Sequence, residues 1–187
     1  GVVMLIVAGT ADARDRPGRQ RTHDVKVQRT ENGHTRQDTW SNDKGKTATR
    51  DATVVNDRDS KTRTRDVVYT GPNGKQVTRE DVTQKTDSGY TRDTTVTTPS
   101  GATITRSAEV ERDAAAGTRT KNVTVTGPNG QTRSVSDAVQ KTDSGYTRET
   151  DVTHANGSMT SRSVEATYDP VTKTWSKTVD VEHTPKP

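Results

Sequence analysis

An internal repeat of 56 residues constrains the fold of this chain more than any other feature of its sequence. Two motifs return at that interval: GPNG at Gly71–Gly74 and Gly127–Gly130, and QKTDSGYTR at Gln84–Arg92 and Gln140–Arg148. Aligned without gaps, residues 71–126 and 127–182 share 26 of 56 positions. Such a period means that one structural unit is built several times.

A third copy, residues 15–70, shares 21 of 56 positions with residues 71–126. None of the four histidines recurs, whereas several glycines and strand-forming residues recur in all three copies. The sequence therefore predicts an N-terminal segment and a tail around three repeats, with these bounds: 1–13, then 15–70, 71–126 and 127–182, then 183–187.

Turn signals divide each copy into segments of about ten residues. In the second copy the signals are Gly71–Gly74, Asp87–Gly89, Pro99–Gly101 and Asp113–Gly117. Pro presets the backbone for a turn, and Asn and Gly accept positive φ, so each cluster can reverse the chain tightly. Turns this short require antiparallel neighbours. We predict an all-β, elongated antiparallel meander with about four strands in each repeat.

The segments between turns have the alternation of strands, with Ile104, Ala108 and Val110 on one face. No apolar stripe of helical period is present, and β-branched Thr and Val are abundant. Hydrophobic residues make up only 25% of the chain, about half the usual share of a globular domain. A conventional enzyme core is therefore not expected, and disorder stays an alternative.

Charged residues follow the repeat. An Arg returns in nearly every segment, with acids such as Asp38, Asp66, Asp93 and Glu149 nearby, which suggests cross-strand ion pairs. The net charge falls from +4 to +1 to −2 through the three repeats. We expect the basic first repeat of one molecule to meet the acidic third repeat of the next. Charge reversal of the assembly residues Asp169, Asp180 and Glu182 to Lys should then slow assembly at low salt.

Two interpretations fit the apolar N-terminus. Residues 1–9 resemble the hydrophobic region of a signal peptide, and Ala11-Asp12-Ala13 resembles a cleavage site, so the mature chain would begin at Arg14. Alternatively, the segment is a retained strand that pairs with a neighbouring subunit, and its deletion would abolish polymerisation. This candidate assembly strand consists of Val2, Val3, Met4, Leu5, Ile6 and Val7.

Motifs for site chemistry are weak. The chain has no Cys, and His23, His34, His154 and His183 lack the spacing of a zinc site. The glycine turns lack the Lys-Ser/Thr pair and the helix of a phosphate loop. Stacking aromatics for a single-stranded nucleic acid are scarce, and nine apolar residues cannot span a bilayer. We expect no catalytic residues, cofactor, metal, nucleic-acid partner or membrane span.

The repeated TGPNG turns, the Thr- and Arg-rich strands and Tyr168-Asp169-Pro170 resemble repetitive secreted bacterial proteins built from β-hairpin repeats, of the surface, matrix and fibre type. The resemblance implies an extracellular or cell-surface structural role in bacteria, with the chain itself as partner in a head-to-tail filament or matrix. Two alternatives are an adhesin or carbohydrate-binding module that takes surface glycans, and an ice-binding surface. The ice-binding surface would use Thr47/Thr49, Thr95/Thr97, Thr103/Thr105 and Thr124/Thr126, with the arginines interrupting the array.

Overall fold

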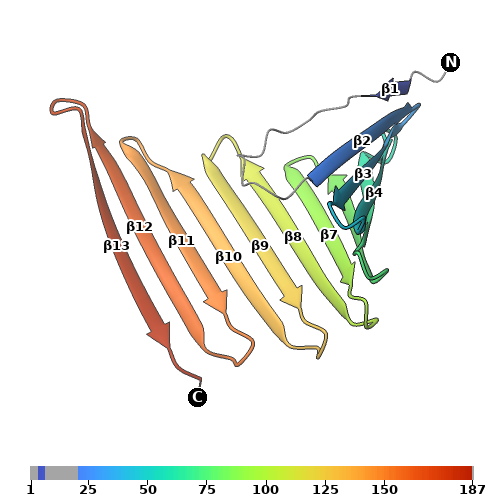
Figure 1. Ribbon diagram of the computed structural model, residues 1–187. Helices are drawn as coiled ribbons and strands as arrows, with labels where there is room; N and C mark the ends of the chain where they lie inside the picture. Colours follow the sequence, from blue (N-terminus) through green and yellow to red (C-terminus); the bar gives the residue numbers. More distant parts are fainter. Residues whose placement is uncertain (1–3, 7–20, 187) are drawn as a thin grey trace. The chain divides into compact units, whose positions relative to one another are not determined.

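The computed structural model describes residues 4–6 and 21–186, and all regular structure in them is β-strand (Figure 1). The strands are β1 Met4–Ile6, β2 Arg21–Thr30, β3 Gly33–Asn42, β4 Thr47–Asp57, β5 Thr62–Thr70, β6 Gln76–Lys85, β7 Gly89–Thr97, β8 Thr103–Asp113, β9 Thr118–Thr126, β10 Thr132–Lys141, β11 Gly145–Thr153, β12 Met159–Asp169 and β13 Thr174–Thr184.

Strand order in the sheet is the order of the chain, and consecutive strands are antiparallel. The predicted all-β antiparallel meander is confirmed. Strands β4, β8 and β12 begin 56 residues apart, and each repeat contributes four strands: β2–β5, β6–β9 and β10–β13.

The predicted turns join these strands. Gly74 donates its backbone N–H to the carbonyl of Gly71 at 2.9 Å, and Gly130 donates equivalently to Gly127 at 3.0 Å. Both glycines have a φ of 74°, a conformation that costs little only without a Cβ. At the Asp113 turn, the Asp113 carboxylate accepts the backbone N–H groups of Ala115 and Ala116. The local sequence thus explains where each strand ends.

Two compact units make up the chain. One comprises Gly1–Thr83 and Thr94–Thr103, and the other Gln84–Asp93 and Ile104–Pro187. The division falls inside the second repeat, so these units and the repeats do not coincide.

Small residues form the core, and they recur at repeat-equivalent positions. The buried pairs are Ala52 with Val54 on β4 and Ala108 with Val110 on β8. On β12, Val comes first and the pair is Val164 with Ala166. The residue between the two members of each pair, Thr53, Glu109 or Glu165, is exposed. One face of each strand therefore carries the scarce apolar material.

Candidate assembly surfaces

Positive charge lies on one face of the strands, the same face that buries Ala and Val. Register shows this in the first unit, where Arg36 lies opposite Ala52 and Arg65 opposite Val54, and in the second, where Arg148 lies opposite Val164. We call this side the arginine face. Its Lys and Arg residues are Arg21, Arg29, Arg36, Arg50, Arg63, Arg65, Arg79, Lys85, Arg92, Arg106, Arg112, Arg119, Lys121, Arg133, Lys141, Arg148, Arg162 and Lys177.

The opposite face carries Thr, Ser and nearly all of the acids, and we call it the acid–hydroxyl face. Among the described strand residues, Lys26 is its only Lys or Arg. Its acids are Asp24, Asp51, Asp57, Asp66, Glu80, Asp93, Glu109, Glu111, Asp113, Glu149, Asp151, Glu165, Asp169, Asp180 and Glu182.

Of the acids expected to form cross-strand ion pairs, Asp38 does so, with Arg50, whereas the separation of charge corrects the expectation for three others. Asp66, Asp93 and Glu149 each directly follow an Arg in the sequence, and adjacent strand residues point to opposite faces. Asp93 instead accepts a hydrogen bond from the Ser107 hydroxyl on its own face. An Arg followed directly by an acid is visible in the sequence. In a strand, this pattern by itself indicates that the two charges lie on opposite faces.

Three acids are exceptions, one in each repeat, and all three are buried on the arginine face: Asp38, Asp81 and Asp137. Arg36 holds Asp38 with two hydrogen bonds, at 2.9 Å from Nε and 2.7 Å from Nη2, and Arg50 of the next strand adds one at 3.0 Å. His23 Nε2 lies 3.0 Å from Asp38 Oδ1. These bonds, chiefly that from Arg36, lower the pKa of Asp38 to about 2 against the opposing effect of burial.

The other two buried carboxylates have similar partners. Arg79 holds Asp81 through Nε and Nη2, both at 2.9 Å, and Thr94 donates its hydroxyl at 2.7 Å. Arg148 Nε donates to Asp137 at 2.7 Å, and Thr150 Oγ1 donates at 2.9 Å. Each repeat therefore neutralises part of its arginine face internally.

The last strand leaves apolar side chains open on the arginine face. Val67, Val123 and Val179 occupy equivalent repeat positions, yet Val67 is 1% exposed and Val179 is 42% exposed. A further strand follows β5, whereas β13 ends the strand order. Val181 and Trp175, on the same face of β13, are 65% and 61% exposed. An edge strand leaves backbone N–H and C=O groups to which a further strand can pair.

At the other end of the strand order, β1 pairs with part of β2. Met4–Ile6, part of the candidate assembly strand, pair with Lys26, Val27 and Gln28 of their own chain. Val2, Val3 and Val7 lie outside the described residues. The segment thus lies on the edge that an end-to-end contact would use.

The three candidate assembly acids lie on β12 and β13. Asp169 ends β12, and hydrogen bonds to its carboxylate from the Thr172 side chain, and then from the backbone N–H groups of Val171 and Thr172, lower its pKa. Asp169 therefore supports a turn, and its reversal to Lys would disturb that turn. Asp180 and Glu182 are exposed on β13, so they are the cleaner residues for charge reversal.

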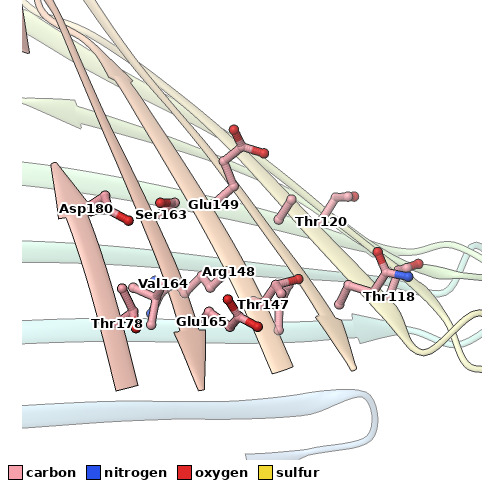
Figure 2. A pocket seen from close by; sticks show the side chains of 13 residues that line it. Thr118, Thr120, Thr147, Arg148, Glu149, Ser163, Val164, Glu165, Thr178 and Asp180 are labelled. Atoms are coloured by element: carbon pink, nitrogen blue, oxygen red, sulfur yellow. The ribbon is translucent and has the colours of Figure 1, made fainter. Parts of the chain in front are cut away.

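A hollow of about 530 Å³ lies across β9–β13 of the second unit (Figure 2). Its walls include the hydroxyl groups of Thr147, Ser163 and Thr178, with the carboxylates of Glu149 and Glu165. Register places Glu149 opposite Ser163, and Ser163 opposite Asp180, so acids alternate with hydroxyls across strands. Nowhere in residues 4–6 and 21–186 do three His, Cys, Asp or Glu residues gather in a group that could hold a metal ion.

A second hollow, of about 740 Å³, lies beside the Trp40 ring in the first unit. The His23 ring stacks on Trp40 with centroids 4.9 Å apart and planes at 9°. Arg21 and Lys46 also line this hollow. It is an aromatic surface of the kind that a sugar ring could contact.

Comparison of the chain with family models, with curated proteins and with solved structures found no match. Among the residues that the structure describes, no helix is long and apolar enough to cross a membrane.

Proposed function

We propose that this protein is an exported, non-catalytic structural subunit that assembles head to tail into an extracellular filament or matrix. The observation that carries the proposal is the difference between Val67 and Val179. Both valines occupy one position of the repeat, and only the valine without a following strand is exposed. A strand added beside β13 would bury Val179 as β6 follows and buries Val67.

The repeat also suggests which strand is added. Strand β2 is the equivalent of β6 and β10, the strands that follow β5 and β9. Between β9 and β10, Val123 lies opposite Val135 and Val125 opposite Arg133. The same register at an intermolecular junction would place Val179 opposite His23, and Val181 opposite Arg21, of the next molecule. A contact between two different ends does not close on itself, so it produces a filament.

The N-terminal segment affects this junction. In the register above, β13 of one molecule would overlap the part of β2 that Met4–Ile6 cover. Removal of residues 1–13 would free that edge. We therefore expect the shortened chain to assemble faster, whereas a segment acting as a donor to a neighbour would make it assemble more slowly.

The variant Val179→Lys tests the proposal, because a Lys on an edge strand opposes strand addition. Val55→Lys is the matched control, since Val55 is 46% exposed and lies on an interior strand, β4. In 0.5 M salt, electron microscopy and sedimentation velocity should show filaments for wild type and Val55→Lys, and monomers with native strand content for Val179→Lys. Filaments of wild-type length from Val179→Lys would refute the proposal.

Two alternatives have an observation in their favour. The Trp40 hollow favours a surface that binds glycans, and a glycan array with no hits would count against it. The paired threonines favour ice binding, because they share the acid–hydroxyl face and the arginines do not interrupt them, contrary to the expectation from sequence. Absence of thermal hysteresis would count against an ice-binding surface.

A further inference from the structure

The end-to-end contact proposed above uses strand edges and leaves both faces of the sheet uncovered. We propose that copies of this chain also stack sheet on sheet, with the arginine face of one molecule against the acid–hydroxyl face of another. This lateral contact depends on side chains, whereas the head-to-tail contact depends on the backbone edges of β13 and β2. The two proposals can therefore fail separately.

Among the described strand residues, the carboxylates of the acid–hydroxyl face have a single Lys or Arg, Lys26, on the same face. Glu109 lies opposite Asn122, Glu149 opposite Ser163, and Glu165 opposite Thr147 and Thr178. All three glutamates are exposed on β8, β11 and β12. These neighbours, and Ala138 on the other side of Glu149, carry no positive charge, so a cation for these carboxylates has to come from outside the face.

The arginine face supplies such cations. Arg133, Lys177 and Arg63 are exposed, and register places Arg133 opposite Val125, Lys177 opposite Ala166, and Arg63 opposite Asn56. Arg side chains bind carboxylates through two parallel N–H groups. On both faces the charged side chains lie on neighbouring strands, which are about 4.8 Å apart. The rows of charge on the two faces therefore have the same spacing.

A second copy is favoured over a polyanion as the occupant. A nucleic acid or acidic polysaccharide would compensate the arginine face and leave the acid–hydroxyl face uncovered. A second copy presents both faces, and each stacked molecule offers a new face to the next. The short Thr and Ser side chains also permit close approach of two sheets, which pack about 10 Å apart in proteins.

The test uses the full chain carrying Val179→Lys, in which edge pairing is blocked, so that self-association reports stacking. In 20 mM salt, sedimentation equilibrium should show oligomers that dissociate in 0.5 M salt, because exposed charges are screened within a few ångströms there. Adding Glu109→Lys, Glu149→Lys and Glu165→Lys should weaken self-association by about tenfold or more. A matched control makes the same change of charge at exposed turns, with Asp43→Lys, Asp59→Lys and Asp143→Lys. This control should keep the self-association of the Val179→Lys protein.

Complementation makes the test independent of folding defects. A second variant, Arg63→Glu, Arg133→Glu and Lys177→Glu, should also fail to associate with itself. An equimolar mixture of the two reversed proteins should associate in 20 mM salt, because each supplies the face that the other needs. A monomeric Val179→Lys protein in 20 mM salt would overturn the proposal. So would oligomers of unchanged strength in the glutamate variant, or binding of heparin in place of self-association.

Discussion

At the scale of single residues, one cross-strand pair in each repeat holds a buried carboxylate, but the strand that supplies it changes. Val25 lies opposite Asp38 between β2 and β3, whereas Asp137 lies opposite Thr150 between β10 and β11. Arg36 and Arg148 occupy equivalent positions and bind the carboxylate in both arrangements. One of the two paired positions therefore carries an Asp, and it can be the position on either strand.

This equivalence predicts a rescue. Asp38→Thr alone should destabilise the protein by about 2 kcal/mol, because Arg36 and Arg50 lose their buried partner. Adding Val25→Asp should restore at least half of that loss, since the pair then has the arrangement of the third repeat. Urea unfolding of wild type, both single variants and the double variant measures the coupling. Simple addition of the two single effects would contradict the equivalence.

Acid should weaken the same site. The pKa of Asp38 is about 2 in the folded protein and 3.8 without its partners. Because the folded value is the lower one, its contribution, on the order of 2 kcal/mol, is complete above pH 4 and is lost as the pH falls from 4 to 2. The difference in unfolding free energy between wild type and Asp38→Asn should shrink over that interval. A difference that stays constant would show that ionisation of Asp38 does not stabilise the fold.

At the scale of strands, a recurring glycine permits close packing at the start of β3, β7 and β11. A Cβ on Gly33, Gly89 or Gly145 would lie 1.8, 1.7 or 1.9 Å from the carbonyl oxygen of residue 54, 110 or 166 on the adjoining strand. Backbone atoms cannot move away as a flexible side chain can. The recurrence of this glycine in the sequence therefore has a steric cause.

Gly89→Ala should consequently lower the unfolding free energy by about 2 kcal/mol or more. Gly127→Ala is the control, because its added Cβ would lie 3.7 Å from the nearest atom, the carbonyl oxygen of Gln131. Chemical denaturation followed by circular dichroism compares the two variants. Equal stability of both would show that β7 and β8 can separate slightly without loss.

At the scale of the whole molecule, each repeat depends on strands from its neighbours. Asp137, which is buried, lies opposite Lys121 of the preceding repeat. An isolated third repeat would expose that side of β10 and leave Val179 exposed on the other side.

We therefore expect residues 127–182 alone to be unfolded, whereas residues 71–182 should show strand content, because neighbouring repeats supply the packing surface. Circular dichroism with thermal melting of the two chains and of the full-length protein is the measurement. Cooperative melting of the 56-residue chain would contradict this dependence.

Strands and turns were predictable from sequence because their causes are local. The turns at Gly71–Gly74 and Gly127–Gly130 follow from residues that accept positive φ, and the strand pattern follows from alternation between them. The opposite placement of arginines and acids is equally local, as in Arg92–Asp93, although the same sequence pattern also suggests ion pairs. Periodicity alone therefore determined the meander and the composition of its faces.

Burial and pairing, in contrast, depend on which strands lie on both sides of a residue. Val67 and Val179 have equivalent places in the repeat, but a following strand covers only the first. Asp38 and Asp66 are both strand acids in the first repeat, and only Asp38 lies opposite an Arg on the buried face. The tertiary structure decided these differences, because the free energy of a side chain depends on the neighbours that remove it from water, and sequence-distant strands supply those neighbours.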